Sequence, residues 1–112
     1  MPFSTLFIAH APDADPETHR SLVDTGLYRL HTVVVKDQAQ ALDLCRRLVA
    51  AEGIQSVLLC PGHTHEDVAA IADVVGDQVS VSVARGDGRS MRVAAKAMED
   101  AGWFAARSPR DA

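Results

Sequence analysis

The sequence is poor in the residues that mark several large classes of protein. It has only two cysteines among 112 residues, Cys45 and Cys60, fewer than a small disulfide-stabilised secreted domain carries. Aromatic residues make up 4% of the chain, which argues against a surface that stacks nucleic-acid bases. The net charge is −4 and Arg46-Arg47 is the one adjacent basic pair, so the basic stripe that binds a phosphate backbone is missing. Nucleic acid is therefore not an expected partner.

Long apolar runs are missing as well. No stretch reaches the roughly 18 apolar residues of a membrane-spanning helix. The first nine residues lack the basic start of a signal peptide. We therefore expect a cytoplasmic protein with reduced thiols and no membrane partner. Residues 1–106 are expected to form a single α/β domain, and residues 107–112 a flexible C-terminal tail.

What the chain does contain is one pattern, repeated four times: an apolar strand, a polar loop, a helical pattern and a glycine. The expected strands are 4–9, 28–36, 55–60 and 78–84. The expected helices are 16–25, one that begins at Asp37, 65–75 and 90–101, with Trp103 and Phe104 closing the core. Each unit ends on a glycine that suits the left-handed position after a helix, namely Gly26, Gly53, Gly76 and Gly102.

The patterns of the strands predict their order in the sheet. Strands 4–9 and 55–60 are apolar on both faces and belong in the centre, whereas 28–36 and 78–84 alternate and belong at the edges. Right-handed crossovers then predict a four-stranded, mainly parallel sheet of order 2-1-3-4, flavodoxin-like, with helices on both faces. A barrel-like order 1-2-3-4 is the alternative, disfavoured because it makes 4–9 an edge. Helix 65–75 is apolar beyond one stripe, so we expect a homo-oligomer through it or through an edge strand.

Polar residues gather where the expected strands end, and parallel strands all end at one edge of a sheet. His10 follows the first strand and is a candidate general base, because imidazole titrates near neutral pH. Cys60 ends the third strand before a helix, where its pKa can fall and a nearby His63 can activate it. We predict these three residues as catalytic. The simpler interpretation is two loop histidines and a small buried cysteine.

Two other roles are expected at the same edge. His10, His63 and His65 are candidate ligands of a divalent metal with water in an open position, although a lone His-x-His is a weak signal and no cofactor is the first expectation. Glycine amides at helix starts, with nearby polar side chains, are expected to bind a small anionic ligand. These candidates are Gly62, Thr64, Arg85, Gly86, Asp87, Gly88 and Lys36.

Three segments carry a resemblance to a known family. They are FIAHAPD at 7–13, CPGHTHED at 60–67 and VARGDG at 83–88. Together they resemble a small bacterial family of stand-alone domains of unknown function, over almost the whole chain. The resemblance implies a bacterial domain and brings no activity, substrate or cofactor.

The clustered titratable residues favour an enzyme. We expect a cofactor-independent isomerase, lyase or hydrolase that acts by acid–base chemistry on a small polar or anionic metabolite. A non-catalytic small-molecule-binding or oligomeric assembly module is the alternative. A histidine-ligated metal site is the second alternative.

Overall fold

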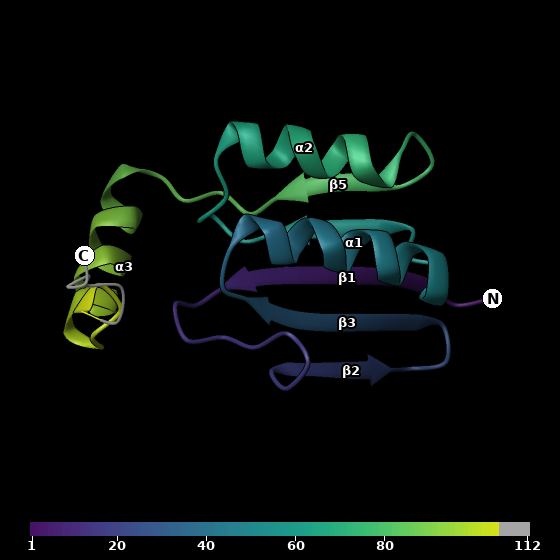
Figure 1. Ribbon diagram of the computed structural model, residues 1–112, viewed down its shortest axis with the longest axis horizontal. Coiled ribbons are helices and arrows are strands. Elements are labelled where there is room, and N and C mark those ends of the chain that lie inside the picture. Colours follow the sequence, from purple (N-terminus) through teal and green to yellow (C-terminus); the bar gives the residue numbers. More distant parts are fainter. Residues whose placement is uncertain (106–112) are drawn as a thin grey trace.

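The computed structural model describes residues 1–105 as a mixed five-stranded sheet with three helices (Figure 1). The strands are β1 (Phe3–His10), β2 (Arg20–Asp24), β3 (Tyr28–Val35), β4 (Ser56–Leu59) and β5 (Ser80–Val83). The helices are α1 (Gln38–Glu52), α2 (His65–Val75) and α3 (Gly88–Asp100). The sheet order is β2-β3-β1-β4-β5, with β2 antiparallel to β3 and the other pairs parallel. The α/β class is confirmed. The expected tail, 107–112, lies outside the described residues.

The sheet has five strands rather than four, because residues 16–25 do not form the expected helix. Asp15 caps only a single turn: its carboxylate accepts from the amide of Glu17 at 3.0 Å and from the hydroxyl of Thr18 at 3.2 Å. The chain then extends into β2, which pairs along β3 and joins it through a hairpin at Gly26, whose φ is 96°. Cross-strand pairing with β3 outweighs the weak helical pattern of this short segment.

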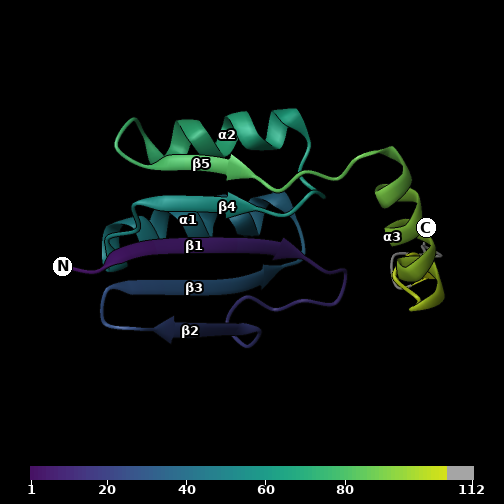
Figure 2. The ribbon, with the colours of Figure 1, turned by 180° about the vertical axis from the view of Figure 1, so that it is seen from behind.

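The four parallel strands lie in the expected relative order, β3-β1-β4-β5, with β2 added outside β3. The helices of the described part of the chain, however, do not cover both faces of the sheet. Helices α1 and α2 contact each other and lie on the same face, as the front and back views show (Figures 1 and 2). The segment expected to be the first helix is β2 instead, so it supplies no helix for the other face. The flavodoxin-like arrangement is therefore not confirmed.

The hydrophobic core lies between α1, α2 and the covered face of the sheet. Alternate strand residues point into it, as the period of two in a strand requires. Its fully buried members include Leu6, Ile8, Val35, Leu44, Val57, Leu59 and Ile71.

The ends of the core helices form as their sequences predict. The side chain of Asp37 accepts from the amide of Gln40 at 2.9 Å and starts α1, and Gly53 ends it at φ 65°. Thr64 and Asp67 form a capping box at the start of α2, with both hydrogen bonds 3.0 Å long. These caps fix where the loops after β3 and β4 end, and so place the residues of those loops.

Helix α3 lies apart from this core. It stands beyond the carboxyl ends of the strands (Figure 1), and among the described residues none of its side chains is buried. Trp103 and Phe104 do not close the core as expected; Phe104 is 47% exposed. Within residues 1–105, no helix is long and apolar enough to cross a membrane.

Candidate functional site

The central pair of strands places His10 beside Cys60. Strands β1 and β4 run parallel with Ile8 opposite Leu59, and the amide of Cys60 donates to the carbonyl of Ile8 at 3.1 Å. Both strands therefore end at the same edge, with His10 and Cys60 side by side. Cys60 Sγ lies 3.8 Å from His10 Nδ1.

A tight turn after β4 adds the second imidazole. The amide of His63 donates to the carbonyl of Cys60 at 3.3 Å, which folds the chain back on itself. His63 Nδ1 then lies 3.7 Å from Cys60 Sγ, and the two imidazole rings are 4.2 Å apart between centroids. The donor atoms of His10, Cys60 and His63 all lie within 4.8 Å of one another. The structure thus brings together the three residues that the sequence analysis proposed as catalytic.

This arrangement favours a thiolate at Cys60. Burial raises the pKa of the thiol, but hydrogen bonds from His10, His63 and the backbone amides of Gly62 and His10 outweigh burial and lower that pKa to about 5. Burial lowers the pKa of His63, and its contacts with the sulfur and carbonyl of Cys60 outweigh this effect, so the net pKa of His63 is raised. The second thiol differs: burial raises the pKa of Cys45 to about 11. Of the two cysteines, Cys60 is therefore the one that is a thiolate near neutral pH.

His63 is the inner member of the cluster. It is 7% exposed, and its Nδ1 also lies 3.2 Å from the carbonyl oxygen of Cys60. Its Nε2 is buried and has no hydrogen-bond partner within residues 1–105. His10 is only half-buried and borders a cavity. The two imidazoles therefore differ in role: His63 is placed to hold the charge of the sulfur, and His10 to meet a molecule from outside.

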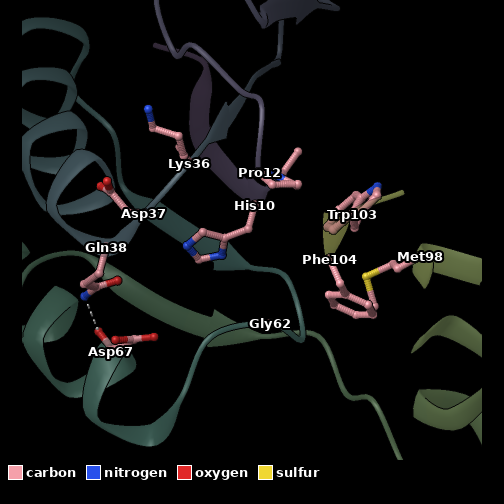
Figure 3. Close-up of a pocket in the computed structure, with 11 residues that line it drawn as sticks. His10, Pro12, Lys36, Asp37, Gln38, Gly62, Asp67, Met98, Trp103 and Phe104 are labelled. Carbon is pink, nitrogen blue, oxygen red and sulfur yellow. Dashed lines mark hydrogen bonds between the residues drawn. The ribbon is translucent and has the colours of Figure 1, made fainter. Parts of the chain in front are cut away.

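The cavity beside His10 has a volume of about 720 Å³ (Figure 3). It lies at the carboxyl edge of the sheet, between the loop after β1, the starts of α1 and α2, and the end of α3. Its lining residues are His10, Ala11, Pro12, Lys36, Asp37, Gln38, Gly62, Asp67, Met98, Trp103 and Phe104. A small metabolite fits a cavity of this size.

Gly62 lies next to both the cavity and the sulfur of Cys60. A Cβ built on Gly62 would lie 3.6 Å from Cys60 Sγ and 3.8 Å from His10 Nδ1. Gly62 itself is exposed and lines the cavity. A bound atom at this Cβ position would therefore contact the sulfur of Cys60 and the imidazole of His10 at the same time. In any residue other than glycine, the Cβ would fill this position.

The other predicted site residues are spread around this edge. Lys36 and Gly62 line the cavity, and Thr64 serves as the cap of α2. Arg85 is 83% exposed, pairs with Asp87 at 2.7 Å and does not line the cavity. Gly86 and His65 border a separate hollow of about 560 Å³, together with His63. Gly88 is exposed at the first position of α3.

Sequence reasoning missed several residues that line the cavity. Gln38 donates from its side-chain amide to the carbonyl of Asp67 at 3.1 Å, which joins the starts of α1 and α2 (Figure 3). Its Oε1 is buried and has no partner in the described part of the chain. The position of Gln38, directly after a strand end, was the available signal. For Met98, Trp103 and Phe104 no such signal exists, because their place depends on where α3 lies.

Comparison with known proteins yields one match. No curated protein and no solved structure matches the chain. A family model described as a family of unknown function (DUF6506) matches residues 3–99, so it covers all three segments that carried the resemblance noted in the sequence. The chain belongs to this family of unknown function, DUF6506.

Proposed function

We propose that the chain is a cofactor-independent enzyme that acts on a small polar molecule through a thiolate and two imidazoles. The observation that supports this proposal is that Cys60 Sγ lies 3.8 and 3.7 Å from the Nδ1 atoms of His10 and His63, and that His10 and Gly62, both next to the sulfur, line a cavity. A low-pKa thiol with an adjacent proton carrier is the arrangement used in both nucleophilic and acid–base catalysis.

The three side chains divide the work. Cys60 acts as nucleophile or as the base that removes a proton from the bound molecule. His10, which faces the cavity, returns or accepts the proton. His63 is a positioning residue: its contact with Cys60 Sγ at 3.7 Å stabilises the thiolate from the buried side, and the same contact raises the pKa of His63. Isomerases, lyases and hydrolases can all use such a pair of proton carriers on one substrate.

The cavity favours a small molecule with both polar and apolar parts. Lys36 and the first turn of α1 favour negative charge, while Asp37 and Asp67 line the same space and oppose it. Met98 and Phe104 supply an apolar wall. Anion binding by Arg85 has less support, because Arg85 is paired with Asp87 outside the cavity. We therefore propose a monoanionic or neutral polar metabolite, in a reducing compartment such as the cytoplasm.

Solvent-deuterium exchange tests this proposal without knowledge of the substrate. The protein is incubated in D₂O with a panel of small 2-oxo acids, 2-hydroxy acids and hydroxyketones, and loss of each carbon-bound proton signal is followed by NMR. At least one compound is expected to exchange with the wild-type protein. The exchange should disappear in Cys60→Ala and fall strongly in His10→Asn, whereas Cys45→Ala, which changes a thiol outside the site, should retain it.

Two outcomes would contradict the proposal. If a compound binds in the cavity, seen as shifted amide signals of Gly62 and Gln38, but neither exchanges nor converts, the chain is a binding module. If Cys60→Ala exchanges as fast as the wild type, the cluster is not the reactive centre.

A metal site is the second candidate function, because the donor set has suitable spacing. Zinc with Zn–S of about 2.3 Å and Zn–N of about 2.05 Å in a tetrahedron places sulfur and nitrogen about 3.6 Å apart. The observed S···N separations are 3.8 and 3.7 Å. The ligands would be His10, Cys60 and His63.

Two observations do not fit the metal site. His65, expected as a ligand, is exposed at the start of α2 and is not part of this group. The orphaned Nε2 of His63 weakens this candidate, since a metal-bound imidazole normally donates its other N–H to a partner.

Metal content decides between the two candidates. Protein prepared without a histidine tag is analysed for zinc, iron, nickel and copper, and is then titrated with Co²⁺ while thiolate-to-cobalt absorption is recorded. A metal site predicts one ion per chain and a signal that Cys60→Ser abolishes. A signal that persists in Cys60→Ser, or no binding at all, would eliminate this candidate.

A further inference from the structure

One face of the sheet is left open by the helices. Within residues 1–105, α1 and α2 cover the same face, and the view from behind shows β1, β3, β4 and β5 with no helix in front of them (Figure 2). Sheets whose central strands are parallel are normally covered on both faces, because both sets of side chains are apolar. The central strands of this sheet are apolar on both faces, but helices of the described residues cover only one of them.

The open face is apolar across its central strands. Leu6 and Ile8 point into the core, so Phe7 between them points to the open face, with Leu58 beside it on β4. On β3, Leu30 and Val34 share this face. The side chains of Phe7, Leu58, Leu30 and Val34 are only half-buried. Strand β5 places Ser82 on this face, whereas β2 places Ser21 and Val23 there, and Val23 is 55% exposed. The apolar surface therefore spans β3, β1 and β4 and reaches Val23 on β2.

Helix α3 has the complementary property. Its apolar residues occupy about half of its circumference, since Val93, Ala94, Ala97 and Met98 fall on one side while Arg92, Lys96 and Asp100 fall on the other. Met98 borders the cavity and Met91 packs against Gly86, but Val93, at the far edge of the apolar side, is 63% exposed. Residues 1–105 therefore cover only part of the helix's apolar side.

The segment before α3 holds this helix away from its own sheet face. Gly86 packs closely between the loop after β4 and α3: a Cβ on Gly86 would lie 3.0 Å from Pro61 Cβ and would collide with Met91. Arg85 and Asp87, on either side of Gly86, pair with each other at 2.7 Å. The four-residue connection, 84–87, thus leads the chain along the edge of the sheet rather than back across the open face.

We infer that a second copy of the chain covers the open face, and that each copy lays the exposed part of the apolar side of its α3, at Val93 and Ala97, over β3, β1 and β4 of the other. The dimensions agree: a helix is about 10 Å wide, which is about two strand spacings and therefore three strands. The 13 residues of α3 extend about 20 Å, within the length of the eight-residue strands β1 and β3.

The expected interface is modest. A helix about 10 Å wide and about 20 Å long covers about 200 Å² of the sheet and loses about 200 Å² of its own surface. The two symmetric contacts of the dimer therefore bury about 800 Å² in total. This area is typical of a weak, concentration-dependent dimer rather than of an obligate one. The interface involves α3 and the open sheet face, not α2 or an edge strand.

Sedimentation of the full chain over a range of about 1–500 μM tests the inference. The mass is expected to rise from 12.0 kDa toward twice that value with concentration. Thr32→Arg places a charge beside Phe7 on the open face, and Val93→Glu places one on the exposed edge of α3. Each should raise the dimer dissociation constant by about tenfold or more. Arg92→Glu, on the polar side of α3, is the matched control and should leave the constant unchanged.

Thermal unfolding monitored by circular dichroism accompanies each variant, and Val93→Glu is the decisive one because its position is exposed within the chain. A monomer at every concentration overturns the inference. So does a dimer that Thr32→Arg breaks and Val93→Glu leaves intact, because the sheets would then pack directly on each other. A dimer that neither variant affects would use another surface. The catalytic proposal is independent of these outcomes.

Discussion

The reactivity of Cys60 at mildly acidic pH gives the sharpest check on the cluster. At pH 5.5 a thiol with a pKa of about 5 is about 75% thiolate, whereas a thiol with the ordinary value of 9.0 is about 0.03% thiolate, a ratio of about 2,400. A low-pKa thiolate is also a weaker nucleophile; with a Brønsted coefficient of about 0.45, four pKa units reduce its reactivity by about 60-fold. Cys60 should therefore be alkylated about 40-fold faster than an ordinary thiol at pH 5.5, but only about twofold faster at pH 7.

Alkylation by iodoacetamide between pH 4 and 10 measures this difference. The modified cysteine is located by mass spectrometry, and glutathione serves as the ordinary thiol. Cys60 should show an inflection near pH 5, while Cys45, which is fully buried, should stay unmodified in the folded protein. His10→Asn and His63→Asn should each move the inflection upward, because each removes a hydrogen bond to the sulfur. An inflection at pH 8 or above in the wild type would refute the thiolate and the roles built on it.

Three further outcomes are expected. Gly62→Ala should leave the melting temperature unchanged, because the nearest neighbour of the added methyl group would be 3.6 Å away. The methyl group should cover the sulfur and slow alkylation of Cys60 by about tenfold. An unchanged rate would contradict the idea that reagents reach the sulfur past Gly62. Leu44→Ala, in the core, should lower the free energy of unfolding, measured in urea, by about 2–5 kcal/mol. Leu27→Ala is the control: Leu27 is 85% exposed, so its loss should lower the same free energy by less than about 0.5 kcal/mol. Thr64→Ala should cost about 0.5–2 kcal/mol in the same assay and Thr64→Ser much less, because serine keeps the capping hydroxyl; equal losses would argue against the cap.

The candidate cluster was accessible to sequence reasoning because its geometry follows from strand pairing. Parallel neighbours end at the same edge, so an expected β1–β4 pair is enough to bring His10 next to Cys60. The proposed metal ligand His65 was misplaced, since sequence spacing does not show which way a side chain points once a helix begins. His63 faces the sulfur from the turn, and His65, two residues later, is exposed on α2.

Local sequence determined most of the elements. Apolar runs marked the four parallel strands, the Asp37 and Thr64 caps marked where α1 and α2 begin, and the chemistry at the strand ends marked the edge that holds the cluster. These features depend on interactions within a few residues, so a pattern in the chain is enough to reveal them.

Only the tertiary structure decided which face of the sheet is covered and what surrounds the cavity. Residues 20–24 form β2 because β3 offers an unpaired edge, a partner that no local pattern reveals. With that segment in the sheet, α1 and α2 are the helices of residues 1–105 that cover it, and they lie on one face. The place of α3, and with it Met98, Trp103 and Phe104 at the cavity, depends on how the segment 84–87 packs against Pro61. Such contacts join segments far apart in the chain, and their outcome depends on which surfaces the rest of the fold leaves free.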